Sequence, residues 1–214
     1  MDTSSSRLDE LERRLDTVQD RVNVERIKRC VAKQQIFTAV FKRVPADYYD
    51  KTLEERRQIL GATSISQLCK TIVLENTSKV GYDVGDPTDS KYYAIVVQYE
   101  AKIDVDALAG KIHALRPPST RLPRKHYKFQ LAPEAVSTAL TGFIHNAVTV
   151  FGMHTPLPVV VCQRVLDCRP AYVFLGGGAV DVKLGLGLRD LTACAGAEVV
   201  GYVSSARAGN YEED

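Results

Sequence analysis

Hydrophobic and polar residues follow two different patterns along the chain, and the change falls near residue 60. Before it, a charged segment carries apolar residues at alternating spacings of three and four, the stripe of a short coiled coil. Its members are Leu8, Leu11, Leu15, Val18 and Val22. After residue 60, short β-like runs alternate with helical segments, which predicts a mixed α/β fold.

The charged segment, residues 7–43, predicts one long helix or two helices in sequence, ending before Pro45 because proline disfavours helix at the residue before it. Apolar residues resume in its second half, at Ile27, Val31, Ile36, Val40 and Phe41. Residues 51–61 predict another helix, stopped by Gly61. The N-terminal helix either packs back on its own domain or docks another chain or a second copy of itself, and the pattern leaves both open.

The second part of the chain predicts a series of strands and helices joined by turns. Asp104 is a candidate N-cap and Pro133 suits the first turn of its helix. The order of elements is not a regular βαβ alternation. We expect strands at 70–75, 92–100, 126–131, 157–162, 171–175, 179–186 and 197–203, and helices at 104–115, 132–140 and 188–195.

Composition excludes several classes of protein. No run of 18 apolar residues occurs, and residues 1–4 do not begin a secretory signal, so we expect a cytoplasmic protein that does not bind membranes. A net charge of +2 allows only a local nucleic-acid patch. The cysteines are odd in number and form no CxxC pair, which favours reduced thiols over disulfides or zinc; they are Cys30, Cys69, Cys162, Cys168 and Cys194. The dinucleotide, P-loop, zinc-protease and serine-hydrolase motifs are missing, so we predict no cofactor and no metal.

One cation interrupts a predicted buried strand. In SISQLCKTIVLE, residues 64–75, Lys70 stands at the entrance of an otherwise apolar run. Burying an ammonium without a partner costs several kcal/mol or more. Lys70 therefore either points to water at the end of the strand or faces a cavity that needs a cation.

Three segments in order resemble the YbaK and prolyl-tRNA synthetase-associated (ProX-like) aminoacyl-tRNA editing domains. They are QLCKTIVLE, GFIHNAVTVFGM (residues 142–153) and YVFLGGGAVDVKLGLGLRDL (residues 172–191). The resemblance covers about residues 60–204 and none of the N-terminal helix. It implies a largely antiparallel mixed sheet flanked by helices, in a domain at 60–207. The charge and apolar pattern predicts a helical extension at 1–59, and low apolar content predicts a disordered tail at 208–214.

Members of this family hydrolyse the ester that links a wrong amino acid to its tRNA, as separate proteins or as domains of prolyl-tRNA synthetase. The resemblance implies that Lys70 is the residue on which activity depends and that it holds the 3′ end of the substrate. Loop 142–153 and the glycine hairpin would line the substrate pocket. The implied substrate-binding residues are His145, Asn146, Ala147, Thr149, Phe151, Gly152, Gly176, Gly177 and Gly178.

The chain departs from the family pattern at two loop positions. Asn146 replaces a usual glycine, and asparagine tolerates left-handed backbone better than other residues. Val150 replaces a usual proline, which restores a backbone donor and could loosen the loop. The hairpin glycines suit a tight turn that needs a positive φ. Asp181 and Lys183 alternate with apolar residues, so we expect both on a solvated face.

A local basic run, residues 116–128, follows a helix and contains two prolines in succession. Arg121, Arg124 and Lys125 could guide tRNA phosphates, or the run could simply be a solvated loop. The family resemblance implies a trans-editing deacylase, with alanine on proline tRNA as the first candidate substrate. The alternative is a catalytically degenerate module that binds tRNA or a synthetase and is recruited into a synthetase complex through its N-terminal helix.

Overall fold

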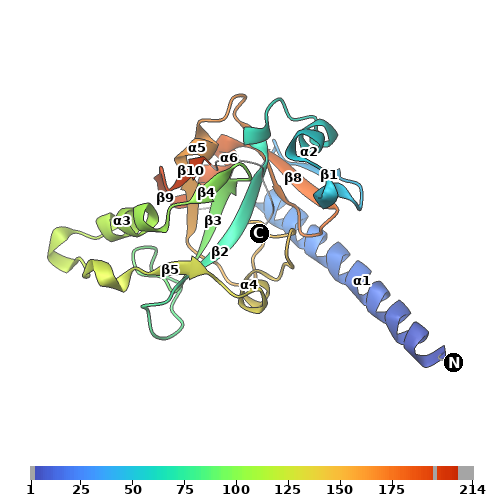
Figure 1. The fold of residues 1–214 in the computed structure, drawn as a ribbon, viewed down its shortest axis with the longest axis horizontal. Helices are drawn as coiled ribbons and strands as arrows, with labels where there is room; N and C mark the ends of the chain where they lie inside the picture. Colours follow the sequence, from blue (N-terminus) through green and yellow to red (C-terminus); the bar gives the residue numbers. More distant parts are fainter. Residues whose placement is uncertain (1–2, 195–196, 207–214) are drawn as a thin grey trace.

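The computed structural model describes residues 3–194 and 197–206 of the chain. Its centre is a mixed five-stranded sheet (Figure 1). The first three strands in spatial order pair antiparallel, and the last two add in parallel. From edge to edge the strands are β5 (Phe129–Leu131), β2 (Cys69–Asn76), β3 (Tyr92–Gln98), β6 (Val159–Cys162) and β9 (Ala197–Gly201).

Two smaller antiparallel sheets complete the β structure. One has the order β1 (Val40–Arg43), β8 (Val182–Gly187) and β7 (Tyr172–Gly176). The other pairs β10 (Ser204–Ala206) with β4 (Ala101–Ile103). Every strand predicted from the sequence is present, although several are shorter than expected. The predicted mixed and largely antiparallel α/β fold is confirmed.

Helices flank the sheets at positions close to the predicted ones. Asp104 caps α3 by accepting a hydrogen bond from the Ala107 N–H at 2.8 Å, and Gly61 ends α2 in left-handed conformation with φ 65°. Thr52 and Glu55 close a capping box at the start of α2, so both ends of this helix are specified locally. The helices are α1 (Thr3–Lys33), α2 (Leu53–Leu60), α3 (Val105–Leu115), α4 (Glu134–Thr141), α5 (Gln163–Leu166) and α6 (Leu188–Cys194), with short 3₁₀ turns at Tyr48–Asp50, Ile65–Gln67, Pro118–Thr120 and Arg124–His126.

The prediction that helix continues through Val40 and Phe41 is wrong. Helix α1 ends at Lys33, and Gln35 then takes a positive φ of 56°. Val40 and Phe41 lie in β1, paired with Gly185 and Leu184 of β8. Helical spacing of apolar residues could not reveal this pairing, because its partner lies far along the chain.

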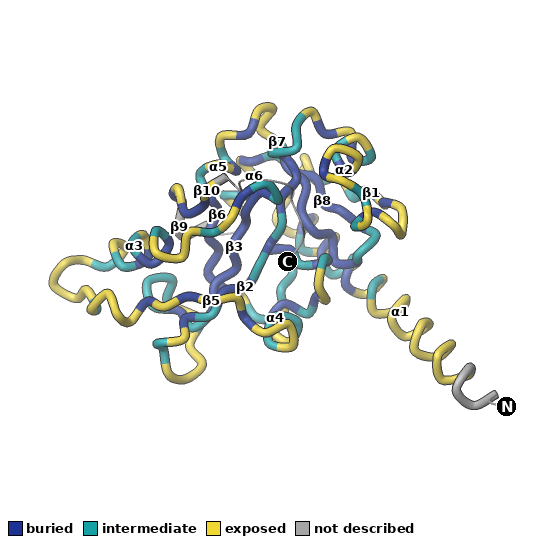
Figure 2. Tube along the Cα trace, viewed as in Figure 1, coloured by how far each residue is buried: buried dark blue, intermediate teal, exposed yellow. Residues whose placement is uncertain are grey.

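Helix α1 has two halves with different environments. Near its C-terminal end, Asn23, Ile27 and Val31 are buried against the domain. Its N-terminal half projects away from the domain, and the five residues of the apolar stripe there are exposed (Figures 1 and 2). The C-terminal half of α1 therefore packs back on its own domain, and docking of the exposed half to another chain stays a prediction. The predicted disordered tail, residues 208–214, lies outside the described residues.

Candidate functional site

A pocket of about 510 Å³ opens between the central sheet and α4. This volume is in the range of sites that hold small molecules. Strands β2, β3 and β4 supply one wall, β5 and the start of α4 another, and loop 142–153 with Gly176 of β7 closes one end. Apolar side chains form much of the lining: Ile72, Val73, Leu74, Val97, Ala101, Ile103, Val105, Leu131, Ala132 and Val148.

Lys70 lines this pocket, which answers the question raised by the sequence. Its neighbours on β2 alternate in burial, and Lys70 and Ile72 are half-buried while Cys69, Thr71 and Val73 are buried. Side chains two apart share a face of a strand, so Lys70 and Ile72 face the pocket together. The Lys70 ammonium lies 5.6 Å from the centre of the Tyr99 ring, within the range of a cation–π contact.

Other polar groups line the pocket around Lys70. Glu134, Ser137 and Thr138 come from α4, and Lys102 from β4. His145 and Asn146 come from loop 142–153; His145 is exposed and Asn146 is half-buried. The α4 residues gave no signal in the sequence, because a polar residue on a surface helix is ordinary.

The predicted site residues divide into two groups. Lys70, His145, Asn146 and Gly176 line the pocket. The other loop and hairpin residues do not appear in its lining, and most are buried in the protein behind it: Ala147, Thr149, Phe151, Gly152, Gly177 and Gly178. The Ala147 N–H donates to Ile144 O, and its carbonyl accepts from the Gly178 N–H at 3.1 Å. Both backbone groups of Ala147 thus serve to fold the loop.

Asn146 adopts the left-handed backbone expected where the family has glycine, with φ 65°. Its carbonyl accepts hydrogen bonds from two residues outside the pocket lining, from the Tyr49 hydroxyl at 2.8 Å and from the Lys183 ammonium at 3.3 Å. Burial, together with neighbouring Tyr99, raises the pKa of Tyr49, so its phenol stays protonated and can donate. Two side chains from outside the loop therefore fix its conformation.

The expectation that Lys183 lies on a solvated face is wrong. Only 4% of Lys183 is exposed, and its ammonium lies 4.3 Å from the ring centre of Tyr49 and 5.1 Å from that of Tyr48. The turn at Tyr48–Asp50 covers this part of β8, which strand alternation alone cannot predict. Asp181 lies partly exposed beside Arg43, as expected. A lysine in an apolar strand, the signal that singled out Lys70, could also have identified Lys183.

A buried arginine completes a cluster of cations and tyrosines behind the pocket. Arg56 is 3% exposed and donates to the Lys51 carbonyl at 2.8 Å and to the Tyr49 carbonyl. Its guanidinium lies 5.1 Å from the Tyr49 ring and 5.7 Å from the Tyr99 ring. Tyr99 thus contacts Arg56 and Lys70, which links the buried cluster to the pocket wall.

The two histidines that flank the loop have different surroundings. His145 lines the pocket, whereas His154 lies beside Arg26 of α1. Burial, and then the Arg26 guanidinium, lower the pKa of His154, so its ring is neutral near pH 7. His154 therefore belongs to the contact between α1 and the loop.

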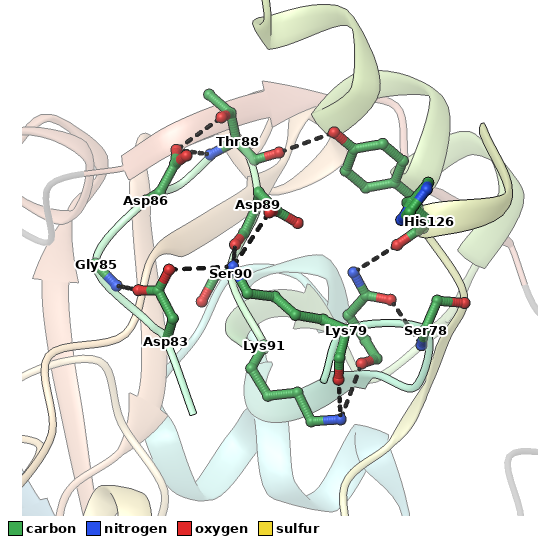
Figure 3. A network of polar contacts seen from close by, with 12 residues as sticks. Ser78, Lys79, Asp83, Gly85, Asp86, Thr88, Asp89, Ser90, Lys91 and His126 are labelled. Carbon is green, nitrogen blue, oxygen red and sulfur yellow. Dashed lines mark hydrogen bonds and ion pairs between the residues drawn. The ribbon is translucent and has the colours of Figure 1, made fainter. Parts of the chain in front are cut away.

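The three predicted tRNA-binding cations are exposed on the segment between α3 and β5, which is anchored on the loop between β2 and β3. Asn76 donates to the His126 carbonyl at 2.8 Å. Within the loop, the Lys79 ammonium pairs with the Asp89 carboxylate, and the Lys91 ammonium donates to the Lys79 carbonyl (Figure 3). Arg116 pairs with Asp86 at 2.7 Å, so its charge is balanced. Arg121 and Arg124 donate to backbone carbonyls of the α3 region but stay exposed, as does Lys125. None of the three lines the pocket.

Metal chemistry has no evident site in the part of the chain that the structure describes. No group of three or more histidine, cysteine, aspartate or glutamate side chains is placed there to hold an ion. Four cysteines with described side chains are free thiols: Cys30, Cys69, Cys162 and Cys168. None of the described helices is long and apolar enough to cross a membrane.

Replacing Tyr49 by phenylalanine tests how the loop is held. The Tyr49→Phe protein loses the bond to Asn146 and leaves the buried Lys183 ammonium short of one acceptor. We expect a loss of about 1–3 kcal/mol in the free energy of unfolding, and faster hydrogen exchange at the amides of residues 145–148. Tyr172→Phe is the matched control, since it removes a hydroxyl that donates to Thr38 O at 3.2 Å, outside the pocket. Equal rates of hydrogen exchange at residues 145–148 in the two variants would contradict the role of Tyr49 in holding the loop.

Comparisons with known proteins bear on the fold alone. No known family model matches the sequence, and no curated protein matches it. Among solved structures, a proposed trans-editing enzyme for prolyl tRNA synthetase matches with a TM-score of 0.64 at 20% identity, covering 86% of this chain and 98% of its own. The hypothetical protein APE2540 matches with a TM-score of 0.61 at 21% identity, covering 84% and 99%. A scaffold protein from epitope-grafting design matches with a TM-score of 0.59 at 20% identity, covering 87% and 97%. The chain therefore shares the fold of these proteins.

Proposed function

We propose that this protein is a trans-editing deacylase that hydrolyses the ester of a mischarged aminoacyl-tRNA. One observation carries the proposal: an apolar pocket of small-molecule size has a half-buried lysine on its wall, at the position that the resemblance assigns to the essential residue. The likeness of the fold to a proposed trans-editing enzyme supports it.

In the proposed complex, the Lys70 ammonium contacts the anionic or hydroxyl-rich 3′ end of the tRNA. The amino-acid side chain occupies the apolar part of the pocket, near Ile72, Ile103 and Val148. A pocket of fixed size excludes large side chains better than it rejects small ones, which favours a small amino acid. Alanine on proline tRNA remains the first candidate.

The reaction is an ester hydrolysis. Water attacks the acyl carbon, the bond from that carbon to the ribose oxygen breaks, and the proton of water passes to the departing oxygen. The products are a free amino acid and a tRNA with its terminal hydroxyl restored. Because the ester is already activated, positioning of the substrate and stabilisation of charge on the carbonyl oxygen can suffice.

A panel of charged tRNAs tests this function. Alanyl-tRNA specific for proline leads the panel, with seryl-, cysteinyl- and correctly charged prolyl-tRNA beside it. We expect the wild-type protein to hydrolyse one ester of a small, wrong amino acid and to spare prolyl-tRNA. If the folded protein hydrolyses none of them, the proposal that it is a deacylase of these esters is wrong.

The alternative function is a binding module without chemistry. It is favoured by the loop residues that lie behind the pocket, since Ala147 and Thr149 are fully buried and cannot reach a substrate. The exposed stripe on α1 would then recruit the protein to a partner. Binding of uncharged and charged tRNA with equal affinity, together with no hydrolysis, distinguishes this module from the enzyme.

The basic segment gives a prediction on tRNA affinity. Reversing Lys125 to glutamate removes an exposed cation without touching the hydrogen bonds that Arg121 and Arg124 make. We expect the Lys125→Glu protein to bind tRNA more weakly and to show a salt dependence whose slope is lower by about one unit. Lys33→Glu, the same change at an exposed position at the end of α1, serves as the control. Identical titrations for both variants across a salt series would exclude the basic segment from the tRNA interface.

A further inference from the structure

The exposed half of α1 carries an apolar seam that nothing in the described chain covers. Leu8, Leu11, Leu15, Val18 and Val22 are between 53% and 67% exposed. Their spacings of 3, 4, 3 and 4 residues place them at the a and d positions of a heptad repeat. Five large apolar side chains on one stripe of a projecting helix are costly to leave in water, so covering the seam with a partner is favourable.

The seam and the contact with the domain use different sides of the helix. Successive residues are about 100° apart around an α-helix, so buried Asn23 points about 100° away from Val22. Ile27 and Val31 continue the domain-facing side. The next d and a positions are the charged residues Glu25 and Arg29, which end the seam. A second helix can therefore lie along residues 8–22 without displacing the domain.

The charges that flank the seam indicate which helix fits it. With Leu8 at a, the g positions are Arg7, Arg14 and Arg21, and the e positions are Glu12, Gln19 and, beyond the seam, Arg26. In a parallel pair of identical helices, each g residue meets the e residue five places later on the partner helix, so Arg7 meets Glu12 and Arg14 meets Gln19. Arg21 would be opposite Arg26, but the Arg26 guanidinium is held by its own domain, where it donates to the Thr141 and Gly142 carbonyls. In an antiparallel pair, g residues meet g residues, which would place the arginines of both copies together.

We propose that α1 forms a parallel two-stranded coiled coil with a second copy of this chain through Leu8, Leu11, Leu15, Val18 and Val22. The two domains then lie at the same end of the coiled coil, each on the outer side of its own helix. Two heptads bind weakly, so the dimer forms in a concentration-dependent way. This proposal is independent of the deacylase activity, because the seam lies outside the pocket.

Sedimentation equilibrium of the full chain over a concentration series tests the dimer. We expect a reversible monomer–dimer equilibrium whose dissociation constant rises at least about tenfold in Leu15→Glu. Thr17→Glu adds the same charge at an exposed position outside the seam and should change the constant less than about twofold. A monomer at every concentration, or a dimer that Leu15→Glu leaves unchanged, would overturn the proposal.

Disulfide trapping tests the orientation. In a Cys30→Ser background, Leu8→Cys places one thiol near the start of the seam of each copy. A parallel pair brings the two Cys-bearing positions together, so we expect a disulfide-linked dimer under mild oxidation. An antiparallel pair brings position 8 to the other end of the seam and gives no cross-link above the Cys30→Ser background. Dimerisation without this cross-link would overturn the parallel arrangement.

Discussion

Lys70→Ala should lower the efficiency of deacylation strongly while the fold persists. Lys70 lines the pocket and is half-buried, so its charge acts in surroundings of lower dielectric than water. Losing one charge-assisted contact with the substrate costs roughly 3 kcal/mol, which corresponds to a decrease of about 10²-fold in kcat/KM. The measurement is the initial rate of deacylation of the best substrate from the panel, at several substrate concentrations.

The matched control is Lys102→Ala. Lys102 also lines the pocket, but it is exposed, and its replacement removes the same charge. We expect less than about a threefold change in kcat/KM for this variant, because water screens an exposed charge. Equal losses in the two variants would mean that the general positive potential matters and that Lys70 has no particular role.

The kinetic parameters distinguish two uses of Lys70. If the ammonium binds the 3′ end equally in the ground state and the transition state, KM rises and kcat is unchanged. If it stabilises charge that develops on the carbonyl oxygen, kcat falls. The position of Lys70 on the pocket wall, in contact with Tyr99, supports the first use, since a lysine held at one side of a site serves as an anchor.

Local signals in the sequence predicted much of the fold. The strands of the second part are present because each is a short apolar run between turns. Helices α2 and α3 begin at the residues that cap them, and α2 ends at Gly61. Lys70 could be identified because its charge contradicts its strand. These features depend on neighbouring residues, so one sequence is enough to find them.

The missed features depend on contacts between distant segments. Val40 and Phe41 become a strand only because β8, about 140 residues later, offers them a partner. Lys183 is buried only because Tyr48 and Tyr49 fold over it. The sequence likewise predicts that all three glycines of the hairpin form a turn, but among these three only Gly178 has a positive φ, 92°. Gly176 lies within β7, where it meets a constraint that no local pattern shows.

That constraint is the close approach of loop 142–153 to β7, and Gly176→Ala should disrupt it. A Cβ added at Gly176 would lie 2.3 Å from the Val148 carbonyl oxygen and 2.8 Å from the carbonyl carbon and oxygen of Ala147. All three are backbone atoms, so a side-chain rotation cannot relieve the overlap. We expect Gly176→Ala to lower the free energy of unfolding by about 3 kcal/mol or more, measured by urea denaturation.

The same substitution should alter the pocket, because Asn146, Val148 and Gly176 all line it. The loop must move away from β7, which lengthens the bonds that Tyr49 and Lys183 make to the Asn146 carbonyl. Gly85→Ala is the matched control, since its added Cβ would have only the Asp83 carboxylate nearby, at 3.8 Å, and its stability should change by less than about 1 kcal/mol. If Gly176→Ala were as stable as Gly85→Ala, the loop would have room to yield at no cost. The pocket would then be adjustable, and its size could not select a small amino acid.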